Sequence, residues 1–354
     1  MLDHAVSVVP KAESSLQNKL VLPLTIGKVV LPNRVFQAPM SGVSDIAFRD
    51  RAERAGAGMV VSEMVASAEF CKADDESAMR ASGANLKNHV VQLAGREAYW
   101  MGEAAKRAEG VGAAMIDINM GCPAKKVTGG YSGSALMRDL DHALTLIEAT
   151  VNAVSVPVTL KMRLGWDDQS INAPELATRA ESAGVHMITV HGRTRCQFYE
   201  GKADWLTIRQ VKESIGVPLV VNGDVRSLSD AVEALEKSGA DAVMIGRGSY
   251  GRPWLAGAIA AEAAGAQSLL PSSSGSLCDY IIEHYQAMIE LYGSKTGVRH
   301  ARKHLGWYLD AHTSGIADLR QKIMTEVEPP RVEALLRDAF HHASGRAIDE
   351  RRAA

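Results

Sequence analysis

One of the four cysteines stands apart by its sequence context. Cysteines occur at positions 71, 122, 196 and 278, and none belongs to a C-x-x-C pair. This spacing disfavours a disulfide framework, a zinc site or an iron–sulfur cluster, so we expect reduced thiols. Cys122 lies between Gly121 and Pro123, on a tight loop just after an apolar run. It is therefore a candidate for chemistry; the alternative is a small buried hydrophobic residue.

Polar residues also occur inside or at the ends of other apolar runs. Gln92 and Lys161 lie within such runs, where an unpaired polar group is costly. His191 ends a third run. Turn formation alone would explain Asn222-Gly223-Asp224, but it explains Gln92 and Lys161 poorly.

The last two runs end in a candidate phosphate site. Asn222, Gly223 and Asp224 follow one run, and Gly246 and Arg247 follow the next. Glycines permit close backbone approach, and a guanidinium adds a fixed fork of donors. GRGSYG (246–251) also matches the dinucleotide fingerprint G-x-G-x-x-G, but no carboxylate ends a strand about 20 residues further on. We therefore favour a phosphate site over a Rossmann site, and no P-loop motif occurs.

A phosphate site beside Met40, Gln92, Lys161 and His191 predicts a flat heteroaromatic cofactor. Gln92 offers a donor and an acceptor to a ring edge. Lys161 can hold a negative ring nitrogen or oxygen of a reduced flavin. Flavin mononucleotide (FMN) has such a ring and one terminal phosphate, so the sequence predicts FMN.

Eight short, β-rich apolar runs position these residues. Helix-like segments lie between them, and several of these segments end in glycine. Eight such units predict an α/β fold, a (β/α)8 TIM barrel, in which chemistry occurs at the C-terminal ends of the strands. An open doubly wound sheet is the alternative. The runs are 34–38, 58–62, 89–93, 115–119, 157–162, 187–191, 218–222 and 241–246.

Beyond the eighth run the sequence changes character. Pro, Ser and Gly mark a linker, and the segments after it have helical spacing. We therefore predict a loosely attached arm (1–22), an FMN-binding barrel (23–264), a linker (265–276), a small all-helical domain (277–345) and a tail (346–354).

Composition excludes several classes of protein. The chain has 354 residues, and 39 Lys and Arg against 41 Asp and Glu give a net charge of −2, so a nucleic-acid partner must meet a local patch. No apolar run approaches the roughly 18 residues of a membrane span. The N-terminus does not read as a secretory signal. We expect a cytoplasmic protein with no membrane association.

Segments from about residue 20 to 320 resemble the tRNA-dihydrouridine synthases, most closely the bacterial B-type branch. The resemblance implies an enzyme that reduces specific tRNA uridines, with tightly bound FMN and with NADPH as reductant. The matching segments are APMSGVSDIAFR (38–49), SEM (62–64), VQLAG (91–95), DINMGCPAKKVTGGYSGSALMRD (117–139), KMRLGWDD (161–168), ITVHGRTRCQFYEGKADW (188–205), VNGDV (221–225) and IGRGSYGRPWL (245–255).

The resemblance also assigns roles to residues of this chain. It implies that Cys122 is the proton donor. It implies that Gln92 and Lys161 contact the flavin ring and that His191 lies near it. The remaining FMN contacts that it implies, from the ring to the phosphate, are Pro39, Met40, Ser41, Asn222, Gly223, Asp224, Gly246 and Arg247.

The reaction itself accounts for the cysteine. A hydride added at carbon six of uracil must be followed by a proton at carbon five, from the face opposite the flavin. An ordinary thiol, with a pKa of about 8.5, is protonated at neutral pH and can still release its proton. We expect Asn119 to hydrogen-bond the uracil edge, and Arg163 to pair with the base or a tRNA phosphate.

The base must be flipped out of the folded RNA, so the helical domain should help to grip the tRNA. The candidate surface is the basic segment 295–307; a solvated helix face is the alternative. His300 and His304 in this segment have i,i+4 spacing but lack the Glu of H-E-x-x-H and a third ligand, so no metal site is predicted. The basic residues are Lys295, Arg299, Arg302 and Lys303.

Two other functions remain open at this point. An FMN barrel could act on a free pyrimidine, as in dihydroorotate dehydrogenases, but those enzymes need no basic helical domain. A non-catalytic RNA-binding protein would have no need of Cys122, Lys161 and Arg247. Nothing in the sequence demands a dimer, so we expect a monomer.

Overall fold

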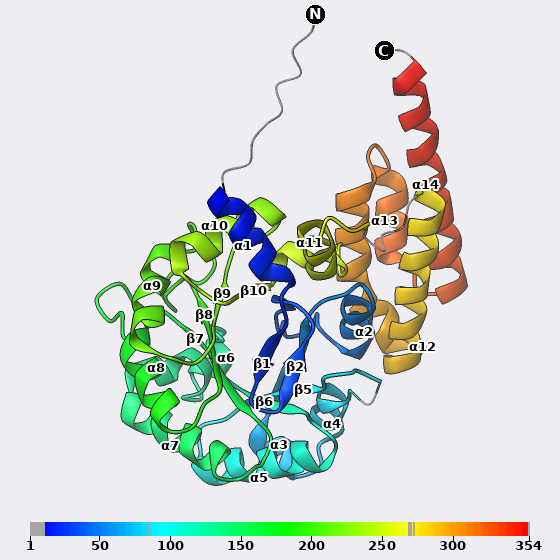
Figure 1. The fold of residues 1–354 in the computed structure, drawn as a ribbon. Coiled ribbons are helices and arrows are strands. Elements are labelled where there is room, and N and C mark those ends of the chain that lie inside the picture. The colour runs from blue at the N-terminus through cyan, green and yellow to red at the C-terminus, as the bar shows by residue number, and fades with distance from the viewer. Residues whose placement is uncertain (1–10, 84, 268–270, 272, 353–354) are drawn as a thin grey trace, which may run out of the picture.

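Eight parallel strands form a closed barrel in the computed structural model, which describes residues 11–83, 85–267, 271 and 273–352 (Figure 1). The strands follow one another around the barrel in chain order, so the predicted (β/α)8 fold is confirmed and the open sheet is wrong. Each strand overlaps one of the eight predicted runs. They are β3 (Val35–Gln37), β4 (Met59–Ala66), β5 (Val90–Ala94), β6 (Met115–Met120), β7 (Val158–Arg163), β8 (Met187–His191), β9 (Leu219–Asn222) and β10 (Ala242–Ile245).

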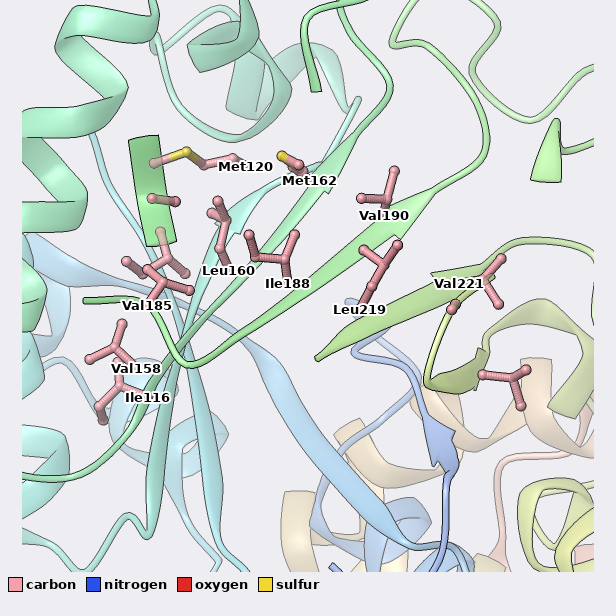
Figure 2. Close-up of a cluster of buried hydrophobic side chains, with 14 of the residues drawn as sticks. Ile116, Met120, Val158, Leu160, Met162, Val185, Ile188, Val190, Leu219 and Val221 are labelled. Carbon is pink, nitrogen blue, oxygen red and sulfur yellow. The ribbon is translucent and has the colours of Figure 1, made fainter. Parts of the chain in front are cut away.

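Alternate residues of the strands point outward to the helices and inward to the barrel axis. Figure 2 shows outward apolar residues of neighbouring strands, among them Leu160 of β7, Ile188 of β8 and Val221 of β9. The residues between them, such as Thr159 and Lys161, therefore point into the barrel. This period of two places polar side chains inside strands that read as apolar.

The barrel interior is apolar at one end and polar at the other. Phe36, Met115 and Met187 belong to the apolar cluster, which also includes residues of a short hairpin. The hairpin, β1 (Leu24–Ile26) and β2 (Val29–Leu31), covers the end where the barrel strands begin. Its turn residue Gly27 has φ +56°, and an added Cβ would lie 2.5 Å from Pro157 Cγ, just before β7. The hairpin thus covers the end of the barrel where the strands begin. The other end, where the strands finish, is the mouth of the barrel.

Helices surround the barrel and link successive strands. They are α2 (Ile46–Arg54), α3 (Ser67–Cys71), α4 (Asp75–Ala81), α5 (Ala98–Gly110), α6 (Lys125–Thr128), α7 (Leu140–Val151), α8 (Ala173–Ser182), α9 (Trp205–Ser214), α10 (Leu228–Ser238) and α11 (Leu255–Ala263). Two 3-10 turns, η1 (Gly133–Arg138) and η2 (Arg247–Ser249), follow β6 and β10. In the part of the chain described here, no helix has the length and apolar character needed to cross a membrane.

The predicted N-terminal arm contains a docked helix. Helix α1 (Lys11–Val21) contacts α10 and α11, and its Leu20 is fully buried. Lys19 Nζ donates to the carbonyl of Ala240 at 2.8 Å and lies 3.3 Å from Asp241 Oδ1. Residues 11–21 are therefore packed against the barrel rather than loosely attached; residues 1–10 of the predicted arm lie outside the described residues.

Three helices form a second unit beside the barrel (Figure 1). They are α12 (Ser274–His312), α13 (Ala317–Thr325) and α14 (Pro329–Arg352), and they share an apolar cluster that includes Ile281, Leu305 and Leu336. Helix α12 begins inside the predicted linker, and α14 continues through most of the predicted tail. Gly293, with φ +74°, bends α12. Helix α12 also packs against α2, so the helical unit contacts the barrel.

Two buried histidines of α12 should make the protein sensitive to acid. His284 and His304 are 1% and 3% exposed, and burial lowers the pKa of both, that of His304 to about 3. Both are neutral in the folded protein, whereas unfolded histidines bind protons below about pH 6.5. Stability is therefore complete above about pH 6.5 and falls as the pH decreases, by about 2 kcal/mol per histidine at pH 5.

Urea unfolding at several pH values checks this prediction. We expect His304→Gln, which cannot titrate, to lose about half of the acid-dependent decrease in the free energy of unfolding. The same substitution at His341, which is exposed on α14, is the control and should leave the decrease unchanged. An equal decrease in His304→Gln and in the unaltered protein would contradict the assignment.

Candidate active site

Polar side chains cluster at the open mouth of the barrel, where they come from successive strands. Lys161 Nζ on β7 donates to Asn222 Oδ1 at the end of β9, at 2.9 Å. Asn222 Nδ2 in turn donates to the carbonyl of Met244 on β10, at 2.8 Å. Burial lowers the pKa of Lys161 to about 8, and the neighbouring Asp117 opposes that decrease. The structure thus brings together two of the predicted cofactor residues, Lys161 and Asn222.

Gln92 and Asn119 form a hydrogen-bonded pair beside Lys161. Gln92 Oε1 accepts from Asn119 Nδ2 at 2.8 Å, and Gln92 Nε2 donates to Asp117 Oδ2 at 2.7 Å. Asn119 Oδ1 accepts the backbone N–H of Gly121 at 3.2 Å and that of Cys122 at 3.0 Å. Asn119 therefore shapes the loop that carries Cys122; its predicted contact with uracil stays a prediction.

Cys122 lies on a loop that is held on both sides. Its carbonyl accepts the backbone N–H of Ser134 at 3.1 Å and the Ser134 hydroxyl at 2.9 Å. Gly133, with φ +61°, packs so closely that an added Cβ would lie 2.8 Å from this carbonyl. The thiol is free and half-buried. Burial raises the pKa of Cys122, so the group is a neutral thiol at physiological pH.

Arg163 acts as a clamp beneath the mouth. It is 1% exposed, its Nε donates to the carbonyl of Gly121, and its Nη1 donates to the carbonyls of Thr194 and Phe198 at 2.7 and 2.8 Å. These bonds tie the Cys122 loop to the loop after β8. The predicted pairing of Arg163 with the base or with a tRNA phosphate stays a prediction.

The candidate phosphate site lies between the adjacent strands β9 and β10. Gly223 has φ +115°, and an added Cβ would lie 2.8 Å from both Ala203 Cβ and His191 Cδ2. Arg247 keeps 41% of its side chain exposed, and its Nη2 lies 3.7 Å from Asp224 Oδ1. Gly246 opens the 3-10 turn that carries Arg247. The predicted glycines and cation therefore meet at one place.

An ion pair that the sequence did not indicate supports this site. Arg193, 1% exposed, donates to both carboxylate oxygens of Asp224, at 3.1 and 2.7 Å, and the Asp224 carboxylate also accepts the backbone N–H of Ala203. These contacts lower the pKa of Asp224 against the effect of burial. Asp224 therefore orients Arg247 and the loop that carries it (246–249), the candidate phosphate loop. Arg193 follows His191 by two residues, in the segment H-G-R at the end of β8. That position was the sequence feature that could have indicated a role for Arg193 in the site.

His191 is a neutral acceptor in this arrangement. Arg193 Nη1 lies 3.2 Å from His191 Nε2, and since a guanidinium only donates, Nε2 accepts. Burial, together with the cationic side chains around it, lowers the pKa of His191 well below its ordinary value. His191 can therefore accept hydrogen bonds through Nε2, but it is a poor proton donor.

The loop after β3 closes another side of the mouth. Pro39 and Met40 are half-buried and Ser41 is exposed. The backbone N–H of Met40 donates to Ser44 Oγ at 2.8 Å, and the N–H of Gly42 donates to Glu63 Oε1. The loop that carries the three predicted residues is therefore held at the mouth through Met40 and Gly42.

Aromatic residues that the sequence did not single out also line the mouth. The ring of Tyr199, 47% exposed, lies beneath two guanidiniums, with Arg247 Cζ at 4.4 Å and Arg163 Cζ at 5.5 Å from its centroid. Tyr250, just after the phosphate loop, stacks on Trp307 of α12 with ring centroids 3.9 Å apart. The helical unit is thus joined directly to the loop that carries Arg247.

The structure divides the predicted basic surface. Lys295 and Arg299 are exposed, whereas Arg302 Nη2 donates to the carbonyls of Thr325 and Glu326 at the end of α13. Lys303 is half-buried, and its Nζ would lie 3.2 Å from a Cβ at Gly42. Its charge acts on Asp45 and Glu63. Contacts of all four cations with tRNA stay predictions. Of the four, Lys295 and Arg299 are the two exposed side chains.

His300 and His304, the histidines with i,i+4 spacing, pack against other aromatic rings. His300 stacks on Tyr292 with ring centroids 4.5 Å apart, and His304 packs against Phe48 and His284. In the described part of the chain, no group of three or more His, Cys, Asp and Glu side chains is arranged to hold a metal ion.

Sequence comparison identifies one family. The family model described as dihydrouridine synthase (Dus) matches residues 36–344. A protein of Rhizobium leguminosarum bv. phaseoli named probable tRNA-dihydrouridine synthase is 57% identical over 323 residues, which cover 91% of this chain and 99% of that protein. A protein of Xanthomonas axonopodis pv. citri (strain 306) named tRNA-dihydrouridine synthase B is 43% identical over 318 residues, 90% of this chain and 96% of that protein.

Solved structures share the barrel at low sequence identity. Morphinone reductase in complex with tetrahydroNAD has a TM-score of 0.50 at 18% identity, covering 73% of this chain and 93% of that chain. The 6-hydroxypseudooxynicotine amine oxidase of Pseudomonas geniculata N1 has a TM-score of 0.56 at 15% identity, covering 70% and 50%. At such identities the likeness concerns the fold alone.

Proposed function

The chain belongs to the dihydrouridine synthase family, and from that premise we propose that it reduces a uridine of tRNA to 5,6-dihydrouridine, with tightly bound FMN as cofactor and NADPH as reductant. The observation that carries the proposal is the half-buried, free thiol of Cys122, whose pKa burial raises, at the same barrel mouth as Lys161 and Arg247. The site thus combines an acid with cations suited to a flavin ring and its phosphate.

The residues at the mouth fit FMN by the chemistry of their donors. Gly223 leaves a concavity that a Cβ would fill, and Arg247 is a half-exposed cation beside it, which suits a phosphate. Lys161 is a half-buried ammonium that a negative ring atom would stabilise. His191 Nε2 is already an acceptor for Arg193. When bound, the flavin supplies the hydride that adds to carbon six of the uracil ring.

The chain's own acid completes the reduction. The Cys122 thiol gives its proton to carbon five, so the C5–C6 double bond becomes a single bond, and the thiolate then regains a proton from solvent. Because the pKa of Cys122 is raised, the sulfur keeps its proton until negative charge develops at carbon five of the uracil ring. Lys161 and Arg163 are the cations that stabilise the transient thiolate. Asn119 and Ser134 hold the backbone of the donor in place.

We further propose that the tRNA is gripped by the helical unit and the barrel mouth together. A uridine stacked inside folded RNA must be flipped out to reach the mouth. Lys295 and Arg299 present free cations on α12, the helix that also contacts the loops after β3 and β10. Phosphate contacts by such cations release counterions, which makes binding dependent on salt.

Replacing Lys295 and Arg299 with alanine is therefore expected to weaken tRNA binding and to reduce its salt dependence. Each lost phosphate contact lowers the slope of log K against log salt concentration by about 0.7–0.9, so the double variant should lose about 1.5. Fluorescence anisotropy with labelled tRNA at several salt concentrations measures the slope.

Two controls accompany this measurement. Lys106→Ala removes an exposed lysine from α5 and should leave the slope unchanged. Reduction of the flavin by NADPH should also be unchanged in the double variant. An unaltered slope in Lys295→Ala/Arg299→Ala would place the tRNA footprint elsewhere.

The absorption spectrum tests the proposed function first. We expect the purified protein to be yellow and to release roughly one FMN per chain on denaturation. NADPH should bleach the colour, and unmodified tRNA should restore it under anaerobic conditions, whereas free uridine should not. A protein that neither carries nor takes up FMN would overturn the proposal.

A further inference from the structure

Asp117 is a buried carboxylic acid inside the barrel that the proposed reaction does not use. It is 4% exposed; its Oδ1 accepts the Thr159 hydroxyl at 2.6 Å, and its Oδ2 accepts Gln92 Nε2 at 2.7 Å. Strand register explains both contacts, because Gln92, Asp117 and Thr159 are partners across β5, β6 and β7. Burial raises the pKa of Asp117, and the ammonium of Lys161 on β7 opposes that rise.

A chain of hydrogen bonds leads from Asp117 to the backbone of Cys122. Gln92 Oε1 accepts from Asn119 Nδ2, and Asn119 Oδ1 accepts the N–H of Cys122 at 3.0 Å. Each side-chain amide has one donating and one accepting end, so the orientation of one amide determines that of the next. The residue at position 117, where this series of hydrogen bonds begins, therefore determines which side-chain atom of Asn119 faces Cys122.

The opposite orientation would be incompatible with the cysteine loop. A donor at position 117 would turn Gln92 Oε1 towards it and the Gln92 amide N–H towards Asn119. The NH2 group of Asn119 would then face the backbone N–H groups of Gly121 and Cys122, which are donors themselves. An ionised carboxylate only accepts, so Asp117 excludes this arrangement.

We infer that Asp117 is a positioning residue for proton donation: its carboxylate fixes the orientation of the Gln92 and Asn119 amides and thereby holds the Cys122 loop. The inference rests on the proposed function for its effect on catalysis. Its effect on the place of the cysteine can be measured without tRNA.

Two substitutions of nearly equal size remove what fixes the orientation of this hydrogen-bond chain. Asp117→Asn alone can keep the order, because the Thr159 hydroxyl can accept from the new amide. Thr159→Val removes that acceptor, so in the double variant either orientation of the new amide leaves one of its ends unpaired, and position 117 no longer fixes the orientation of Gln92 and Asn119. Thr159→Val alone keeps the carboxylate and is the matched control.

The first readout is alkylation of Cys122 by iodoacetamide at about pH 8, below the ordinary thiol pKa. We expect the loosened loop of Asp117→Asn/Thr159→Val to hydrate the thiol and to speed alkylation about tenfold, the effect of one pKa unit. The rate is mapped by peptide mass spectrometry, with the exposed Cys196 as the internal reference. Thr159→Val should alkylate at nearly the rate of the unaltered protein.

The second readout separates the steps of the reaction. Single-turnover transfer to tRNA should fall about 100-fold in the double variant, as expected for a displaced catalytic group, and by more than the reduction of the flavin by NADPH, which does not use Cys122. A variant damaged only in its fold would lose both steps together.

Moving the carboxylate within the double variant provides the rescue. In Asp117→Asn/Thr159→Val/Asn119→Asp the carboxylate at position 119 again accepts the N–H of Cys122, and Gln92 turns over to donate to it and to accept from the new amide at position 117. Alkylation of Cys122 should return to nearly the rate of the unaltered protein. If the variants with Thr159→Val do not fold, as judged by thermal melting, Asp117→Leu decides alone, because leucine offers Gln92 no acceptor; alkylation of Cys122 as slow as in the unaltered protein then overturns the inference.

The outcomes distinguish the inference from the proposed function. Unchanged alkylation in Asp117→Asn/Thr159→Val overturns the positioning role, whatever happens to tRNA. The expected alkylation pattern, in a protein that makes no dihydrouridine, supports the positioning of Cys122 and refutes the proposed function.

Discussion

Cys122→Ala is expected to bind FMN and tRNA and to accept electrons from NADPH, yet to fail in the transfer to uridine. Removal of a general acid costs about 10²–10⁴-fold in rate. The structure gives the physical reason, because the thiol is half-buried, protonated and held by Asn119 and Ser134 at the barrel mouth. Single-turnover oxidation of the reduced flavin by unmodified tRNA measures the step, with dihydrouridine counted in the product.

The other cysteines provide matched controls. Cys196→Ala should transfer normally, since this exposed cysteine lies beyond His191 on the next loop. Cys122→Ser should be nearly as slow as Cys122→Ala, because a hydroxyl is a much weaker acid than a thiol. Near-normal transfer in Cys122→Ala would make the cysteine structural. His191 would then be a poor replacement, since its Nε2 accepts from Arg193.

Arg247→Ala is expected to release the flavin. A charge-assisted contact with a phosphate contributes about 1.5–3 kcal/mol, which corresponds to about 10- to 150-fold in the dissociation constant. Asp224 and the ring of Tyr199 orient Arg247. Because the side chain is partly exposed, solvent screens its charge, and we expect the lower half of this range. Titration of the apoprotein with FMN, followed by fluorescence quenching, measures the change.

A lysine at the opposite end of the barrel serves as the control. Lys28 is exposed in the hairpin turn between β1 and β2, so Lys28→Ala should bind FMN as the unaltered protein does. A dissociation constant for FMN in Arg247→Ala equal to that of the unaltered protein would count against the phosphate site between β9 and β10.

The barrel could be predicted from sequence because its signals are local. Buried parallel strands are short apolar runs, and the glycines that end the helices between them mark a regular alternation. Gln92 and Lys161 were identified because polar residues inside buried strands require partners, whereas Asn222 was identified as part of the candidate phosphate site. The structure supplies those partners within the chain itself.

The supporting contacts could not be predicted because they join distant segments. Arg193 and Asp224 are 31 residues apart, and Arg163 reaches the carbonyl of Gly121, 42 residues away. Sequence reasoning assigned Arg163 to the substrate, which stays a prediction, and could not show that the same guanidinium also joins two loops. The hairpin of β1 and β2 escaped notice for another reason, since strands of three residues are too short to show a period.

The basic segment of α12 shows that contacts between distant segments are also hard to predict for a helix. Spacing indicates which residues share a face, but not whether that face is covered. Arg302 meets the end of α13 and Lys303 meets the loop after β3, so only Lys295 and Arg299 remain exposed. Trp307, which lies beyond the basic cluster, joins the helical unit to the phosphate loop through Tyr250.

The most direct test of the central proposal is to incubate the purified protein with FMN, NADPH and tRNA transcribed without modifications, and to analyse the digested tRNA by mass spectrometry. The account predicts a nucleoside heavier than uridine by two hydrogens, formed in proportion to the NADPH consumed and absent with Cys122→Ala. Consumption of NADPH with no such nucleoside in the tRNA, or reduction of a free pyrimidine in preference to tRNA, would contradict it.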